Sequence, residues 1–577
     1  MKKKFLVVSN IERKKSKKNI YPFFSAVESR DQLKNYCYNF EYLNNYSSNS
    51  KLIIKDSKYL LKFYEKLLNI LSKLLNKKHN LHYDSLFWRI LIGPWLGMFI
   101  YSYFLKWKTI NKIKNKNDKF KIKIYSLNND ELVPKNMEHF SSLINSELWH
   151  QKIGQKICQN FFIKKNQFFV NKLKINNYGL KSDVLNFKKI VILVLNTLFK
   201  KKDQKYLIIN SYLGFFREIF LNLKLKQYPT FDIFGKKLKS RKVNFNERKK
   251  LYAQINSFKF KKKFERNFIK DFVNEIPTSF LEGFEDLELL SKELNFPEKP
   301  KIVFSSNFHR NTLLSYYIAK KKLEGSKLYI GQHGGLYGAT LFSWFEKHEI
   351  KISDNFFSWG WKTNEKKIKN LGILIKLKNI KWNSKNKKIL FLLRSRNKYP
   401  ASFLSGTNTE NYLNYCNNLN KIFLKLNKDI KKKIVLRYPP NFFSKQNKNS
   451  FINTKDLIID NNDNFYKKLK NSALAINTTH STPFLQVMAI NFPNILILNG
   501  KDNPLKDTKS FNLLKKANIF HDNYKSASKF INNLDSSEKI FNWWYSNNTQ
   551  KAVNVFCNKH AKFKSNITNN IKKIMTK

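Results

Sequence analysis

From about residue 185 to residue 498, short apolar runs alternate with segments of helical periodicity, and no other feature constrains the fold as strongly. The polar stretch 383–388 divides the runs into two series. They are 205–210, 301–306, 327–332 and 355–360 before it, and 389–394, 433–438, 457–460, 473–477 and 494–498 after it. Continuous apolar strands that alternate with helices form parallel sheets covered on both faces. The sequence therefore predicts an α/β protein with two doubly wound domains that face a cleft, where ligands bind at the carboxyl ends of the strands.

The regions on either side of the two series are predicted to be mostly helical. Helical periodicity covers 58–77, 85–115 and 139–170, with short strand candidates at 4–8 and 121–126. We predict an N-terminal half over 1–382 that starts helix-rich and continues as an α/β domain. A second α/β domain covers 383–535, and a helical tail covers 536–577.

Residues 86–105 form a 20-residue segment with a single charge, Arg89. Its length suits a membrane-spanning helix. Gly93 and Pro94 lie near its middle, however, and its Trp and Tyr residues are distributed along it rather than placed at its ends. This pattern favours a buried, kinked core helix or an interfacial helix over a membrane span.

The chain is strongly basic, with 109 Lys and Arg against 41 Asp and Glu and a net charge of +68. Such a charge suggests a nucleic-acid or polyanion-binding protein as one alternative. The lysines are spread along nearly the whole chain and mixed with asparagines, which indicates a compositional bias instead. We therefore expect no nucleic-acid partner, although an attraction to anionic lipid headgroups remains.

The four cysteines carry no disulfide or zinc-site pattern. They are Cys37, Cys158, Cys416 and Cys557, which are far apart in the sequence. This usage fits a reducing cytoplasm, and the chain is expected to be cytoplasmic. Any contact with lipid is expected at the inner face of the membrane. No resident metal or cofactor is predicted.

The first chemistry-bearing loop is "GQHGGLYG" (331–338), which follows the apolar run 327–330. Four of the 16 glycines of the chain lie here, so that the backbone can approach a ligand closely. Free N–H groups in such a turn suit a phosphate or carboxylate, and Gln332, Gly334 and Gly335 would form this wall of the cleft. His333 is a candidate general base, or a hydrogen-bond donor to a phosphate. The structural alternative is a tight turn with a capped histidine.

The second such loop lies at "NTTHSTPFLQ" (477–486), where a strand ends and an amphipathic helix begins. Ser481 or Thr482 can cap this helix, with Pro483 in its first turn. Capping alone would use only one hydroxyl of this loop and would leave Thr478, Thr479 and His480 unexplained. Together with the helix N-terminus, the loop would bind a diphosphate or a sugar. The candidate ligands are Thr478, Thr479, His480, Ser481 and Thr482.

Arginines follow two strands of the second series. Arg394 and Arg396 come after one strand and Arg437 after another. At the carboxyl ends of one sheet they would reach the same cleft, where arginine binds phosphate bidentately. No P-loop GxxxxGK[ST], GxGxxG after the first strand, GxSxG or HExxH is present, so the sequence supports neither an NTPase nor a dinucleotide enzyme.

Three residues are candidates for the base that deprotonates an acceptor hydroxyl. His333 lies in the glycine-rich loop, His309 follows the run 301–306, and Glu346 comes shortly after the glycine-rich loop. The sequence does not choose among them.

In four places the chain resembles the transferases encoded in O-antigen and other surface-polysaccharide loci, a family with a GT-B-like glycosyltransferase core. The matching segments are "HYDSLFWRILIGPWLGMFIY" (82–101), "GQHGGLYG" (331–338), "DNFFSWGW" (354–361) and "NTTHSTPFLQVMAINFPNIL" (477–496). The resemblance implies a metal-independent glycosyltransferase that moves a sugar from a nucleotide-sugar donor to a surface-glycan or glycolipid acceptor. Residues 1–382 would then be the acceptor side and 383–535 the donor side, with Arg394, Arg437 and the loop 478–482 on the donor phosphate.

The chain departs from the family pattern where Gln486 stands in place of the usual Glu of Phe-Leu-Glu. Gln486 can still hydrogen-bond a donor hydroxyl, but as a neutral partner. The order of "VLRYPP" and "THST" is also similar to the phosphate loops of bacterial sialyltransferases, with Tyr438 where a His would stand, which makes a CMP-sugar a candidate donor. A nucleotide-sugar epimerase, which needs no acceptor, is a further alternative.

Overall fold

The computed structural model describes most of the chain. The described residues are 4–6, 20–21, 50–114, 120–127, 130–161, 168–172, 201–230, 238–341, 343–394, 399, 409–439, 452–454, 457–460, 464–498 and 505–577. Arg396 and Cys37 lie outside them. Within them the predicted α/β class is confirmed, because the strands form three sheets whose pairings are all parallel.

The middle of the chain builds a five-stranded sheet in the order β5-β6-β7-β8-β9. Its elements are β5 (Tyr206–Ile208), α7 (Phe215–Lys224), α8 (Phe245–Asn256), α9 (Lys263–Phe272), α10 (Phe284–Lys292), β6 (Ile302–Ser305), α11 (Thr312–Leu323), β7 (Lys327–Gly331), α12 (Trp344–Ile352), β8 (Asn355–Ser358) and β9 (Ile368–Asn370). The four strands predicted from the first series are confirmed. The sequence missed β9, a three-residue edge strand whose burial is too partial to leave an apolar run.

The C-terminal part builds a six-stranded sheet in the order β12-β11-β10-β13-β14-β15. Its elements are β10 (Lys388–Leu392), α13 (Thr409–Lys425), α14 (Lys428–Lys433), β11 (Ile434–Arg437), β12 (Ile458–Asp460), α15 (Phe465–Lys470), β13 (Ser472–Asn477), α16 (Thr482–Ala489), β14 (Asn494–Ile497), α17 (Thr508–Lys516), β15 (Phe520–His521) and α18 (Tyr524–Asn533). All five predicted strands are confirmed. The two-residue β15 was missed because it is too short to carry a pattern.

The N-terminal region contains a third parallel sheet, in the order β2-β1-β3-β4, besides its helices. Its elements are β1 (Lys4–Leu6), β2 (Ile20–Tyr21), α2 (Ser50–His79), α3 (Ser85–Lys114), β3 (Phe120–Ser126), α4 (Met137–Leu143), α5 (Glu147–Phe161) and β4 (Phe168–Lys172). The predicted strands near 4–8 and 121–126 are confirmed. The prediction of helix up to residue 170 was wrong, because β4 begins at Phe168 and pairs with β3.

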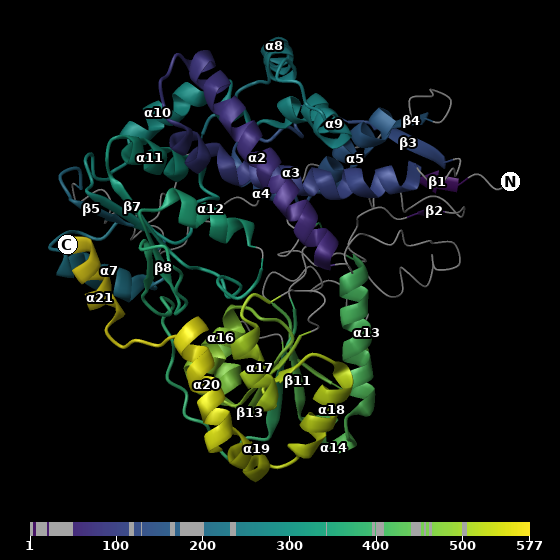
Figure 1. Cartoon of the computed structure of the whole chain (residues 1–577), viewed down its shortest axis with the longest axis vertical. Helices are drawn as coiled ribbons and strands as arrows, with labels where there is room; N and C mark the ends of the chain where they lie inside the picture. Colours follow the sequence, from purple (N-terminus) through teal and green to yellow (C-terminus); the bar gives the residue numbers. More distant parts are fainter. Residues whose placement is uncertain are drawn as a thin grey trace.

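Three helices after the second sheet lead the chain back to the first. They are α19 (Ser537–Trp544), α20 (Asn547–His560) and α21 (Ile567–Thr576), so the helical tail is confirmed. The segment between α20 and α21 pairs with the exit of the middle sheet, where the Lys562 N–H donates to the Trp359 carbonyl at 2.9 Å. In Figure 1 the yellow tail runs beside the lower sheet and ends with α21 next to α7.

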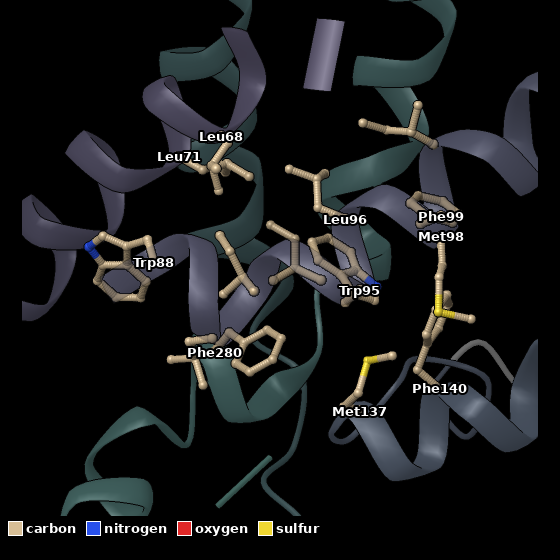
Figure 2. Close-up of a cluster of buried hydrophobic side chains, with 14 of the residues drawn as sticks. Leu68, Leu71, Trp88, Trp95, Leu96, Met98, Phe99, Met137, Phe140 and Phe280 are labelled. Carbon is tan, nitrogen blue, oxygen red and sulfur yellow. The ribbon is translucent and has the colours of Figure 1, made fainter. Parts of the chain in front are cut away.

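Helix α3 holds the segment 86–105 in the core of the N-terminal half. Trp88, Trp95 and Phe99 are fully buried, and the helix packs against α2, α5, α11 and α12. Figure 2 shows Trp95 and Phe99 among side chains of this cluster, with Phe140 and Phe280 nearby. The prediction of a buried core helix is confirmed. Among the described helices, none has the length and apolarity needed to cross a bilayer.

Replacement of Trp95 by alanine is expected to lower the free energy of unfolding by about 3–5 kcal/mol, because the large cavity cannot collapse in a packed core. The Trp95 ring stacks 6.0 Å from Phe99 and 6.1 Å from Phe272. Urea denaturation measures the change. The matched replacement of exposed Leu424 on α13 by alanine should change stability little, and an equal loss in both variants would contradict the packing described here.

Candidate active site

The two loops singled out in the sequence meet face to face. A Cβ placed on Gly335 would lie 2.6 Å from the carbonyl carbon of Ser481 and 2.7 Å from the Thr482 nitrogen, at the start of α16. Only a glycine allows the backbone of the first loop this close to the second. A backbone bridge between Thr340 and Leu505 joins the two halves nearby. The exits of β7 and β13 therefore form the two sides of one candidate site.

Gln332 holds the first loop in shape. Its side-chain oxygen accepts hydrogen bonds from the Trp359 N–H at 2.9 Å and the Trp361 indole at 2.8 Å, and its amide donates to the Gly334 carbonyl at 2.8 Å. The side chain is fully buried. Gln332 thus links the exits of β7 and β8 and fixes the backbone on both sides of His333.

His333 and His309 share one carboxylate, which the sequence analysis missed. The Glu349 Oε1 atom lies 3.1 Å from His309 Nε2 and 3.5 Å from His333 Nδ1. The first distance is a hydrogen bond, and the second is a close electrostatic contact slightly beyond one. His309 and Glu349 are buried, whereas the His333 side chain keeps 23% of its surface exposed. His333 is therefore the member of this cluster that a substrate can reach.

Burial sets the charge state of the cluster. Loss of solvent raises the pKa of Glu349 to about 7, although His333 acts in the opposite direction. Burial lowers the pKa of His333, and Glu349 partly offsets this. Burial also lowers the pKa of His309, to about 3. A neutral His333 beside a carboxyl that ionises near neutral pH has the protonation state of a general base.

Glu346, the third candidate base, lies one turn before Glu349 on α12. It accepts a hydrogen bond from the Gly338 N–H at 2.9 Å, and burial raises its pKa to about 7. Gly338 has a φ of +71° and packs against the Trp361 ring, which leaves no room for a Cβ. Glu346 thus ties down the end of the glycine-rich loop. The sequence analysis named Glu346 but not Glu349, which follows it by three residues on the same face of α12.

Hydroxyl groups line the second loop. Thr478 is buried, and its hydroxyl donates to the Leu392 carbonyl at 2.9 Å and lies 2.8 Å from the Tyr415 hydroxyl. Thr479, Ser481 and Thr482 are half-buried, and the backbone of Ser481 and Thr482 lies against Gly335. Ser481 is the N-cap residue of α16, yet its side chain makes no capping hydrogen bond. Its hydroxyl is therefore not used to satisfy the helix end.

His480 turns away from this loop surface. It is fully buried, and its ring lies 5.7 Å from Phe484 and 5.2 Å from Phe511. Burial lowers its pKa to about 3. A neutral ring in an aromatic core shapes the loop from behind, where a ligand in the cleft does not reach it.

A hollow opens at the carboxyl ends of β10, β13, β14 and β15. It encloses about 480 Å³, including the open space at its mouth. Its polar lining comprises Arg394, Tyr415, Asn418, Thr478, Asp522, Asn523 and Tyr524. The backbone N–H of Arg394 donates to the Tyr415 hydroxyl at 3.0 Å. Arg394 and Thr478, predicted from separate motifs, are thus brought together.

Two other predicted donor residues have protein partners. Arg437 is buried, and its guanidinium donates to Asp460 at 2.5 Å, while Lys468 lies 3.2 Å from the other oxygen of Asp460. Gln486 on α16 donates to the Tyr466 hydroxyl at 3.2 Å. Arg437 therefore supports the strand ends of the sheet through an ion pair.

Among the described residues, no group of three or more His, Cys, Asp and Glu side chains could hold a metal ion.

Solved structures that resemble the chain are distant. MurG of Acinetobacter baumannii shares 10% identity at a TM-score of 0.28, over 61% of this chain and 99% of its own. The spinosyn rhamnosyltransferase SpnG shares 8% at 0.31, over 65% and 100%. A mutant O-GlcNAc transferase of Thermobaculum terrenum shares 8% at 0.29, over 84% and 91%. At these TM-scores the fold assignment rests on the parallel sheets of the chain itself.

No curated protein matches the sequence. One family profile does match it, over residues 4–575, and its description is LIC12162 family transferase. The match spans nearly the whole chain and includes both loops of the site. The chain therefore belongs to the LIC12162 family of transferases.

Proposed function

We propose that the protein is a glycosyltransferase that moves a sugar from a nucleotide-sugar donor to a hydroxyl of a surface-glycan or glycolipid acceptor. The observation that carries this proposal is the contact of Gly335 with the start of α16, because it brings the loop that carries a candidate base against a helix N-terminus. Such a pair supplies both parts of a sugar transfer. One part activates the acceptor, and the other stabilises the departing phosphate.

On the donor side, the start of α16 offers backbone N–H groups, of which Pro483 supplies none, and the positive end of the helix dipole to the diphosphate or phosphate of the donor. Ser481 and Thr482 add hydroxyls beside it, and Arg394 and Thr478 line the adjacent hollow. We assign the nucleotide to that hollow and the phosphate to the 478–482 loop. Arg437 and His480 act as positioning residues, through Asp460 and through the core, respectively.

On the acceptor side, His333 takes the proton from the attacking hydroxyl as that oxygen bonds to the anomeric carbon. The bond from this carbon to the donor phosphate breaks, and the phosphate leaves with the electron pair. Glu349 stabilises the imidazolium that forms, and His309 holds Glu349 in place by the 3.1 Å hydrogen bond. The site is proposed to need no metal, because the helix N-terminus and Arg394 supply the positive field.

This assignment predicts a transfer rate that rises with pH through about 7. His333 has a lowered pKa and is already neutral there, so the rising limb belongs to Glu349, whose ionised form makes the imidazole more basic. A pH profile of kcat measures it. The Glu349→Gln variant should lose this limb and keep a slower, flatter profile. An unchanged limb in that variant would contradict the role of Glu349.

The proposal is tested by nucleotide release from a panel of UDP-, GDP- and CMP-sugars, with glycolipid extract as the acceptor and with EDTA in a parallel series. One nucleotide class should be released in proportion to sugar transferred, and EDTA should leave the rate unchanged. A CMP-linked sugar is a member of the panel because of the "VLRYPP" and "THST" arrangement. Conversion of the sugar without an acceptor would indicate an epimerase and overturn the proposal.

A further inference from the structure

Helix α7 presents an apolar stripe to solvent next to the candidate site. Phe216, Phe220 and Leu223 are 74%, 50% and 59% exposed. Their spacing of four and then three residues puts them on one face of the helix. The opposite face is covered, because Leu221 and Asn222 are buried and α21 packs against the helix (Figure 1). The exposed stripe is thus the outer face of a helix whose other side packs on the protein.

Basic groups border this stripe. The Lys224 ammonium lies 4.2 Å from the centre of the Phe220 ring, and the Lys376 ammonium lies 5.9 Å from that of Phe216. Arg217, which lies between Phe216 and Phe220 in the sequence, is half-buried. The one acidic residue of the helix, Glu218, accepts hydrogen bonds from the backbone and hydroxyl of Ser211. Its charge is therefore directed to the start of the helix rather than to the stripe.

Helices that lie in the headgroup region of an anionic bilayer typically combine exposed aromatic and aliphatic side chains with neighbouring Lys and Arg. A protein partner of the same patch would place acidic residues against these cations. A bilayer with anionic lipids supplies the same charge and also an apolar layer for the phenyl rings. The net charge of +68 adds a general attraction to such a surface.

We propose that the α7 stripe, defined as Phe216, Phe220 and Leu223 with Lys224 and Lys376, docks the protein on an anionic lipid surface. The stripe is close to the candidate base, since Tyr212 just before α7 has its ring 5.8 Å from that of His333. A protein docked by this helix would hold His333 near the headgroup layer, where a lipid-linked acceptor presents its sugar. This purpose rests on the proposed function, but lipid binding itself needs no donor.

The test is co-sedimentation of the full chain with vesicles, without any sugar nucleotide. Vesicles of phosphatidylcholine with about a third phosphatidylglycerol should bind the protein, and pure phosphatidylcholine should bind it far less. The double substitution Phe216→Ser with Phe220→Ser should lower the partition coefficient at least about tenfold. Lys376→Gln should lower it about fivefold on the anionic vesicles and leave the neutral ones unchanged.

The matched control is Leu424→Ser, which removes a side chain that is 73% exposed on α13, on the far side of the molecule from α7 in Figure 1. It should bind vesicles as the unsubstituted protein does. Equal binding by the Phe216/Phe220 variant would overturn the proposal, provided that its melting temperature is retained. A dimer that this double substitution dissolves, without any change in lipid binding, would assign the stripe to a second copy of the chain. A fall in lipid binding with unchanged transfer to a soluble acceptor would leave the proposed function intact.

Discussion

Replacement of His333 by alanine is expected to lower kcat about 10²- to 10⁴-fold, the range that a positioned general base contributes. The imidazole is the only reachable member of the His333–Glu349–His309 cluster, since the other two side chains are buried. Donor affinity should change little, because the proposed donor groups belong to the other sheet. Steady-state kinetics with donor binding measured separately resolve the two effects.

The exposed histidine His82, between α2 and α3, provides the matched control. His82→Ala should keep kcat and donor affinity. A His333→Ala enzyme that loses donor affinity and retains its maximal rate would show that His333 binds phosphate, which is the other role the sequence left open. The base would then have to be sought elsewhere on the acceptor side.

Replacement of Gly335 by alanine is expected to reduce the transfer rate about 100-fold, the effect of a displacement near 1 Å between reacting groups. The new Cβ would meet the backbone of Ser481 and Thr482 at 2.6 and 2.7 Å, and backbone atoms cannot move aside as a flexible side chain does. The overpacking should also cost about 1–3 kcal/mol of stability. Both effects follow because one methyl group pushes the two halves of the site apart.

Gly334→Ala is the steric control for this substitution. Its Cβ would have Tyr337 as nearest neighbour, at 3.6 Å, which is an ordinary contact. The variant should keep the melting temperature, whereas Gly335→Ala should lower it. Equal melting temperatures in the two variants would mean that the loops are not in contact in solution.

The strands of both α/β sheets were predictable from sequence because buried parallel strands are continuously apolar. In β6, β11 and β13 every residue is buried, so the runs stand out. Two edge strands were not predictable, because β9 contains only one apolar residue in three and β15 is only two residues long. The third sheet was not predicted because β2 has only two residues and β4 begins within the segment 139–170, whose periodicity predicts a helix.

The site was predictable as two loops but not as a set of contacts. Strand exits with glycines and hydroxyls identified the 331–338 and 477–486 segments, which the structure brings together at Gly335. Glu349 was missed because an acidic residue in a helix is usually solvated, and only the fold buries it between two histidines. His480 and Arg437 look like ligands in the sequence. Tertiary packing instead turns the His480 ring into the core and pairs Arg437 with Asp460 of the neighbouring strand.

The central claim, that the protein binds a nucleotide sugar between the two loops, is tested most directly by calorimetric titration. The full chain is titrated with UDP-, GDP- and CMP-sugars at low and high salt, and with single-stranded DNA under the same conditions. The account predicts saturable binding of one nucleotide class at one site per chain, with weaker binding in Gly335→Ala. Absence of binding to every nucleotide sugar, together with DNA binding that falls steeply with salt, would contradict it and identify a polyanion-binding protein.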